Sequence, residues 1–220
     1  MIARPPSQGG EVNHGSGIVL RYEERFFFLT AAHVIKAWSD KRATDASLML
    51  HLAAPRGSAK FEPGDRLAHY DLNTDLAVLR LSAEEAFSTG LYPYDVLSWP
   101  PPAPIVGEQV FIAGLPLQGR SKIAPIRYEF LSFTLGTQVS TVASENFKCL
   151  FKREDWITQT GMEESPPASL GGVSGGPVMA MRGLRLTLLG VVSEHSEVLD
   201  LLVASRLDSI PESAFSEHPA

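Results

Sequence analysis

The sequence predicts an all-β fold of the sandwich or barrel type, divided into two subdomains of similar size. Short runs rich in Val, Ile, Leu, Phe and Thr recur at close spacing, with Gly, Pro, Asn or Asp between them. Long helical periodicity is missing. A third observation is the stretch SWPPPAP at 98–104, because three consecutive prolines cannot lie inside a central strand. It places a stiff, extended connector near the middle of the chain.

The candidate strands follow one another along the whole chain. Before the prolines they are 17–22, 25–30, 47–52 and 76–81. After the prolines they are 108–114, 130–142, 148–151, 155–160, 177–181, 184–193 and 201–206. Two short segments, 31–38 and 83–87, are the candidate helices. Many short strands separated by turn residues are typical of all-β sandwiches and barrels.

Length and charge narrow the classes of function. The chain has 220 residues, of which 44% are hydrophobic and 20% charged, so we expect a substantial core rather than disorder. The net charge is −6, from 19 Lys and Arg against 25 Asp and Glu. Phosphate binding needs a basic patch, so nucleic acid is not expected as the main partner.

Cysteine usage and hydropathy favour a reducing, cytoplasmic location. Cys149 is the single cysteine, so no internal disulfide can form. The first 17 residues hold no apolar run of signal-peptide type and no stretch approaches 18 apolar residues, so we expect neither a leader nor a membrane partner. We expect no metal and no cofactor, because no ligand-like spacing appears among the six histidines at 14, 33, 51, 69, 195 and 218.

Three polar residues lie beside apolar strands or in a glycine-rich turn. His33 follows RFFFLT and two alanines, and Asp75 heads LAVLRL. Asp71 competes with Asp75, but no apolar run follows it directly. Ser174 lies in GGVSGGP. Taken singly, these are consistent with a structural histidine, a capping aspartate and a plain hairpin turn.

The glycines around Ser174 can be explained by the backbone turn that a nucleophilic serine needs. A serine hydroxyl is a poor nucleophile until a neighbouring base removes its proton. Glycine permits a tight turn with positive φ and a close approach of substrate. Such a turn can aim the backbone N–H groups of Gly172 and Ser174 at one point, which is the arrangement of an oxyanion hole.

Together, TAAH around His33, DLAVL beginning at Asp75 and GxSGGP around Ser174 resemble the three motifs of the chymotrypsin-like (trypsin-fold) serine proteases, in the same order. GSGIVL at 15–20 and VGEQVFIAGLP at 106–116 are similar to bacterial protease domains of the high-temperature-requirement type.

The resemblance implies a fold and a division of the chain. It implies two antiparallel Greek-key β-barrels with the active site in the cleft between them. The expected parts are an N-terminal arm (1–11), a first barrel carrying His33 and Asp75 (12–98), the connector (99–105), a second barrel (106–207) and a C-terminal tail (208–220).

The resemblance also implies a serine endopeptidase acting on protein or peptide substrates without a cofactor. Ser174 would attack the carbonyl, His33 would act as general base and Asp75 would orient it, with Gly172 and Ser174 as the oxyanion hole. Because His33 must be neutral to act as base, activity should rise as the pH climbs towards and through 7.

The sequence departs from the secreted members of the family. Val173 stands where they have an aspartate that pairs with a new N-terminus, so activation by N-terminal cleavage is not expected. By position, the expected substrate-binding residues are Ala168, Ser169, Ser193, Glu194 and His195. Ala168 carries no charge, which predicts a small or uncharged residue before the cleaved bond, and Ser193 is expected to support Asp75.

The same residues bear on two other functions. An α/β-hydrolase also uses G-x-S-x-G, but its acid and then its histidine follow the serine. Here Asp200 or Asp208 is followed only by His218, in the polar tail at the end of the chain. A trypsin fold that only binds a partner, without activity, stays open, as does a regulatory protein partner. After 206 we expect no room for a substrate-binding PDZ domain.

Overall fold

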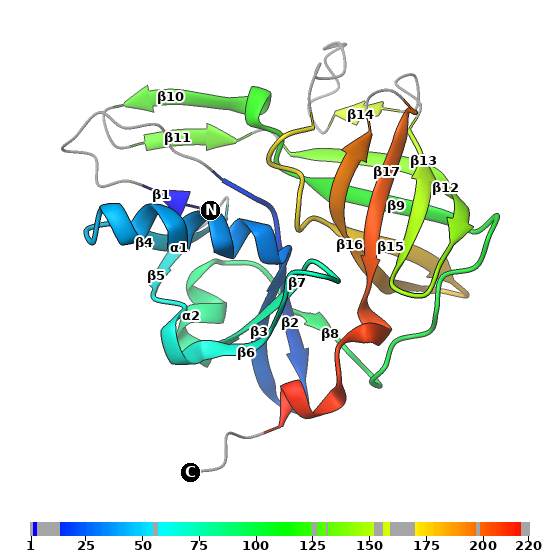
Figure 1. Ribbon diagram of the computed structural model, residues 1–220, viewed down its shortest axis with the longest axis horizontal. Coiled ribbons are helices and arrows are strands. Elements are labelled where there is room, and N and C mark those ends of the chain that lie inside the picture. The colour runs from blue at the N-terminus through cyan, green and yellow to red at the C-terminus, as the bar shows by residue number, and fades with distance from the viewer. Residues whose placement is uncertain are drawn as a thin grey trace.

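The computed structural model describes residues 2–3, 14–54, 57–124, 127–130, 132–151, 156–158, 170–196 and 199–216 (Figure 1). Strands dominate both halves of the chain. Within these residues, no helix is long and apolar enough to cross a membrane. The expected all-β fold of two packed halves is confirmed by the sheets described next.

The described residues of the N-terminal half form two sheets. One has the order β6-β7-β3-β2-β8, with bounds Leu67–Asp71, Leu76–Leu81, Arg25–Thr30, Ile18–Tyr22 and Tyr94–Asp95. The other has the order β1-β4-β5, with bounds Ile2–Ala3, Met49–Ala54 and Gly57–Phe61. The central strands β3 and β7 are almost wholly buried, which explains why their sequences are continuous apolar runs rather than alternating ones.

Two α-helices accompany these sheets in the described part of the chain. Helix α1 (Ala32–Thr44) is longer than the segment 31–38 that the sequence predicts. Its first half buries Val34, Ile35 and Trp38. Its second half is polar and adds no apolar periodicity, but the guanidinium of Arg42 lies 5.1 Å from the Trp38 ring. Helix α2 (Ala83–Ser88) begins at a capping box formed by Ser82 and Glu85.

The C-terminal half contains a closed barrel. Its strands follow the order β13-β17-β16-β15-β9-β12, and β12 pairs with β13 to close the ring. Their bounds are Asn146–Leu150, Leu201–Arg206, Arg185–Ser196, Pro177–Arg182, Gln109–Gly114 and Phe133–Val142. Strand β14 (Trp156–Thr158) pairs with β12, and β10 (Arg120–Ala124) forms a hairpin with β11 (Arg127–Phe130). Burial alternates along β12, as expected for a barrel wall.

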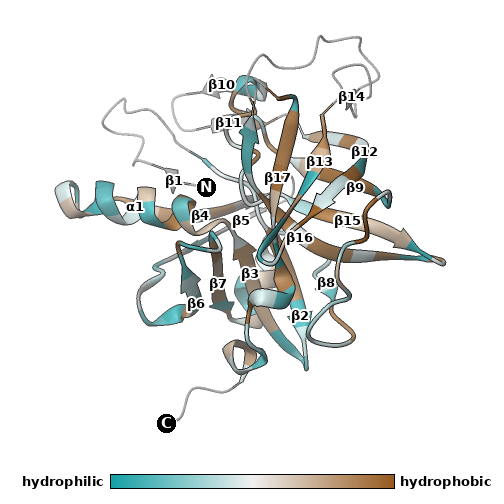
Figure 2. Ribbon diagram, turned by 45° about the vertical axis from the view of Figure 1, so that its right-hand side comes forward, coloured by the Kyte–Doolittle hydropathy of each residue, from teal (hydrophilic) through white to brown (hydrophobic). Residues whose placement is uncertain are grey.

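The two halves share a core. Leu188 of β16 packs in the same buried cluster as Phe27 of β3 and Trp99 of the connector. The chain then leaves the barrel through η5 (Leu207–Ser209) and η6 (Glu212–Phe215) and returns to the N-terminal half (Figure 1). There the Phe215 ring lies 4.3 Å from that of Trp99. Figure 2 shows apolar residues on the strands of both halves.

Candidate active site

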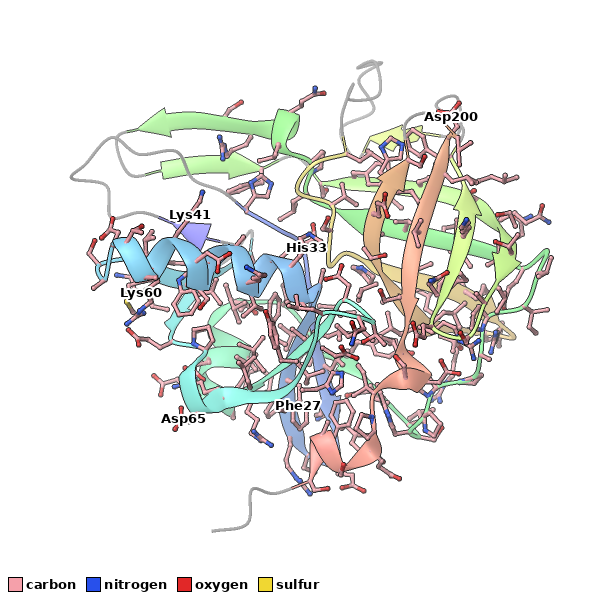
Figure 3. The ribbon with its side chains drawn as sticks, viewed as in Figure 1. Phe27, His33, Lys41, Lys60, Asp65 and Asp200 are labelled. Atoms are coloured by element: carbon pink, nitrogen blue, oxygen red, sulfur yellow. The ribbon has the colours of Figure 1, made fainter. Side chains whose placement is uncertain are left out.

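His33 lies at the N-terminal end of α1, between the two halves of the molecule (Figure 3). Asp75 contacts it there. The ring Nδ1 of His33 lies 2.8 Å from Asp75 Oδ2, and the His33 amide donates to Oδ1 at 2.9 Å. A carboxylate can only accept, so Nδ1 carries the proton in this pair. In the neutral ring Nε2 is therefore left with a lone pair, which is the state a general base needs.

The turn before β7 gives Asp75 its orientation. Asp75 has a φ of +54°, a region in which aspartate is tolerated better than most residues. Asp71 builds this turn: its carboxylate accepts from the Asn73 amide at 2.8 Å and from the Thr74 hydroxyl at 3.0 Å. The hydrogen bond from Asn73 lowers the pKa of Asp71. Asp71, the competitor of Asp75 in the sequence, is thus part of the turn that presents Asp75.

The loop of residues 170–176, called here the oxyanion loop, has its peptide groups fixed one by one. The Gly171 carbonyl accepts from the Leu117 amide at 2.7 Å. The Val173 amide donates to the Leu170 carbonyl at 3.0 Å, and the Val173 carbonyl accepts from the Gly176 amide at 2.8 Å. In a planar trans peptide the carbonyl and the next amide point in opposite directions.

The amides of Gly172 and Ser174 take no part in these hydrogen bonds. They share their peptide groups with the bound carbonyls of Gly171 and Val173, so they point away from those partners. Among the described residues, neither amide donates a hydrogen bond. Gly172 has a φ of +91°, and a Cβ there would lie 2.6 Å from the Leu115 carbonyl oxygen, so only glycine fits.

Ser174 lies against the segment that carries His33. Its carbonyl accepts from the Ser16 amide at 2.7 Å, and Gly175, the next residue, lies so close to β3 that a Cβ there would be 3.0 Å from the Ala31 nitrogen. Within the described part of the chain, Ser174 Oγ and His33 form no hydrogen bond. Such contacts are commonly long before substrate binds.

A family model for the trypsin-like peptidase domain matches residues 15–187. The chain is a trypsin-like peptidase domain. No curated protein matches the sequence. A solved structure described as "Aromatic interactions drive the coupled folding and binding of the intrinsically disordered Sesbania mosaic virus VPg protein" is 15% identical, with a TM-score of 0.45, and the match covers 87% of this chain and 78% of that one.

In this peptidase domain Val173 is a core residue. Its side chain is fully buried in the cluster that fills the C-terminal barrel. A Cβ on Gly114 would lie 2.8 Å from Val173 Cγ1, so the glycine at the end of β9 makes room for it. Packing therefore anchors the oxyanion loop at the position where the secreted enzymes have an aspartate.

A cavity of about 370 Å³ adjoins the His33–Asp75 pair. Its lining also includes Glu145 and the predicted residues Ser193 and Glu194. Ser193 lies at a bulge between β16 and β17, and its hydroxyl donates to the Val203 carbonyl at 3.1 Å, rather than to Asp75 as expected.

The other predicted substrate-binding residues divide into two groups. His195 lies in β16, which extends to Ser196 beyond the predicted end of the strand, and its ring contacts that of Phe151 with centroids 4.9 Å apart. Ala168 and Ser169 lie outside the described residues. In the described ranges no group of three or more His, Cys, Asp or Glu could hold a metal ion.

Sequence reasoning missed the residues behind the oxyanion loop. Ser16 is buried, and its hydroxyl donates to the Gly172 carbonyl at 2.8 Å. His14 is also buried, with Nε2 2.7 Å from the Leu115 carbonyl oxygen. Burial lowers the pKa of His14 to about 4. The signal that could have found Ser16 is its place between two glycines directly before a strand.

Proposed function

We propose that this trypsin-like peptidase domain is a serine endopeptidase with Ser174 as nucleophile. The observation that supports it most is the doubly hydrogen-bonded His33–Asp75 pair. Through Ser16, the strand that precedes His33 is tied to a loop in which the amides of Gly172 and Ser174 donate no hydrogen bond among the described residues. A base with an accepting nitrogen and a pair of free donors are the two parts that acyl transfer needs.

The proposed reaction has two halves. In the first, Ser174 Oγ attacks the peptide carbonyl carbon while His33 Nε2 takes the hydroxyl proton, and the amides of Gly172 and Ser174 stabilise the oxyanion. His33 then gives that proton to the leaving amine and an ester to Ser174 remains. In the second half, water loses a proton to His33, attacks the ester and releases the acid, and the proton returns to Ser174.

We propose a protein or peptide substrate with a small or uncharged residue before the cleaved bond, because Ala168 offers no charge to a Lys or Arg side chain. A peptide-library cleavage profile tests this preference. Cleavage after Arg or Lys as the main product would overturn it. Comparing the cleaved proteins of cells with the wild type and with Ser174→Ala would identify natural substrates.

A fluorophosphonate probe, which forms a bond only with an activated serine, tests the reaction itself. We expect labelling of the wild type and of Ser209→Ala, whose hydroxyl merely binds the Arg206 carbonyl. We expect none with Ser174→Ala and strongly slowed labelling with His33→Ala. Labelling that persists in Ser174→Ala would show that another residue is the nucleophile.

The second candidate is a binding module with a silent trypsin fold. It is favoured by one observation: within the described residues Ser174 Oγ makes no hydrogen bond to His33. In that case the wild type would resist the probe at every pH, with and without peptide substrates.

A further inference from the structure

Ser16 joins four segments that meet behind the active site. Its hydroxyl donates to the Gly172 carbonyl and accepts from the Leu115 amide, both at 2.8 Å. Its own amide donates to the Ser174 carbonyl at 2.7 Å. Its carbonyl accepts from the Thr30 hydroxyl, also at 2.7 Å. Every polar group of this buried residue thus has a partner, and the partners lie in three other segments: the oxyanion loop, the segment after β9 and the end of β3.

These bonds hold the oxyanion loop from both sides. Through Gly172 the hydroxyl of Ser16 fixes the middle peptide of the loop, whose neighbours carry the two free amides. Through Leu115 it fixes the segment that leads to Leu117, and the Leu117 amide in turn holds the Gly171 carbonyl. If the peptide between Gly171 and Gly172 turned over, the Gly172 amide would face away from the substrate.

The same residue ties this loop to the base. Thr30 is fully buried at the end of β3, three positions before His33. Because the Thr30 hydroxyl binds the Ser16 carbonyl, the distance between the nucleophile loop and the start of α1 depends on Ser16. Val173 anchors the loop by packing, but packing alone does not choose the direction of a carbonyl.

We propose that Ser16 is a positioning residue, whose hydroxyl keeps the oxyanion loop in the form that presents the amides of Gly172 and Ser174 to substrate. Its catalytic consequence rests on the proposed peptidase function. In the secreted members of the family, an aspartate at the position of Val173 pairs with a new N-terminus and orders this loop. We propose that the hydroxyl of Ser16 orders it in this protein. The loop is therefore formed without a cleavage step.

The test compares Ser16→Ala with Thr89→Ala. Thr89, at the C-terminal cap of α2, is a matched control, because its buried hydroxyl also donates to a carbonyl (Ala86) and accepts from an amide (Leu91). Both variants lose one doubly bonded buried hydroxyl. We expect similar losses of thermal stability, but only Ser16→Ala should lower kcat, by about 10- to 100-fold, with KM changed less than threefold.

Hydrogen exchange keeps the loop assignment testable whatever the activity. In Ser16→Ala, the hydrogen-bonded loop amides of Val173, Gly175 and Gly176 should exchange at least tenfold faster. In Thr89→Ala they should not change. If the wild type proves inert, the peptidase proposal fails, but unchanged exchange in Ser16→Ala is what would overturn the role of Ser16 in ordering the loop.

A second variant covers the case in which Ser16→Ala does not fold. Thr30→Val keeps the side-chain shape and removes only the hydroxyl that holds the Ser16 carbonyl. We expect faster exchange in the oxyanion loop and a lower kcat, each smaller than for Ser16→Ala. A variant with the stability loss but with wild-type kcat and loop exchange would contradict the proposal.

Discussion

His33 and Asp75 are joined twice, since both the ring Nδ1 and the backbone amide of His33 bind the two carboxylate oxygens of Asp75, at 2.8 and 2.9 Å. The Ala32 amide also donates to the Asp75 carbonyl at 3.2 Å. The carboxylate therefore fixes the first turn of α1 as well as the ring that it carries. Both residues come from the N-terminal half, so this pair is complete without the C-terminal barrel.

Asp75→Asn should remove most of the activity and leave the fold in place. An amide has only one accepting oxygen, so it cannot serve both N–H groups of His33 and disturbs the tautomer that leaves Nε2 free. We expect kcat to fall by about 10³- to 10⁴-fold. Rates of peptide cleavage and of fluorophosphonate labelling measure it. Asp95→Asn, which only weakens a surface ion pair with Arg21, is the control. An Asp75→Asn variant with a tenth of wild-type activity would contradict the role of Asp75.

Gly175→Ala should destabilise the protein strongly. A Cβ at Gly175 would lie 2.2 Å from the Ser16 carbonyl oxygen and 2.3 Å from Thr30 Oγ1, and the φ is +85°. We expect a loss of about 3 kcal/mol or more in the free energy of unfolding. Gly183→Ala isolates the backbone strain, because its φ is +64° but nothing lies within 4 Å, and it should cost about 1 to 2 kcal/mol. Denaturant unfolding measures the loss for each variant. Equal losses in the free energy of unfolding would contradict the close approach of Gly175 to Ser16 and Thr30.

Val173→Asp should not restore a secreted-type enzyme. It would place a carboxylate in the fully buried core of the C-terminal barrel, where the described residues of the cluster include no Lys, Arg or His. We expect a loss of about 3 kcal/mol or more in the free energy of unfolding. Val106→Asp is the matched control, since Val106 is largely exposed. Thermal unfolding of the two variants measures this loss. A Val173→Asp protein as stable as Val106→Asp would show that position 173 is not closed to water.

Acid should weaken the fold through His14. Burial lowers its pKa from 6.5 to about 4, with a smaller contribution from the charge of Arg120. Between pH 4 and 6.5, His14 is thus neutral in the folded state but protonated in the unfolded chain. The contribution of His14 to the free energy of unfolding is therefore fully present above pH 6.5. It is lost as the pH falls from 6.5 to 4, by an amount on the order of 2–3 kcal/mol.

His14→Gln separates this contribution from that of the other histidines. Burial also lowers the pKa of His51 and of His69, so the wild type carries all three effects. The difference between wild type and His14→Gln in the free energy of unfolding should shrink from pH 7.5 to pH 4. Urea unfolding at several pH values gives these free energies. A difference that is constant over this range would contradict a buried neutral His14.

Some of the fold follows from local pattern. The predicted strands 25–30, 76–81 and 201–206 coincide with β3, β7 and β17, because continuous apolar runs bounded by turn residues have few alternatives. Strands β5 and β6 have weakly apolar sequences and form by pairing with β4 and β7. The polar end of α1 was also beyond prediction, since the helix continues there without an apolar stripe.

By itself the sequence determined the fold class, the family resemblance and the order of the motifs around His33, Asp75 and Ser174. The tertiary structure alone decided which carbonyl each peptide of the oxyanion loop faces, and so which amides stay unpaired. Ser16 and Gly172 are 156 positions apart. A single hydrogen bond across that separation leaves no periodicity or spacing in the sequence, because its geometry exists only after both halves have packed.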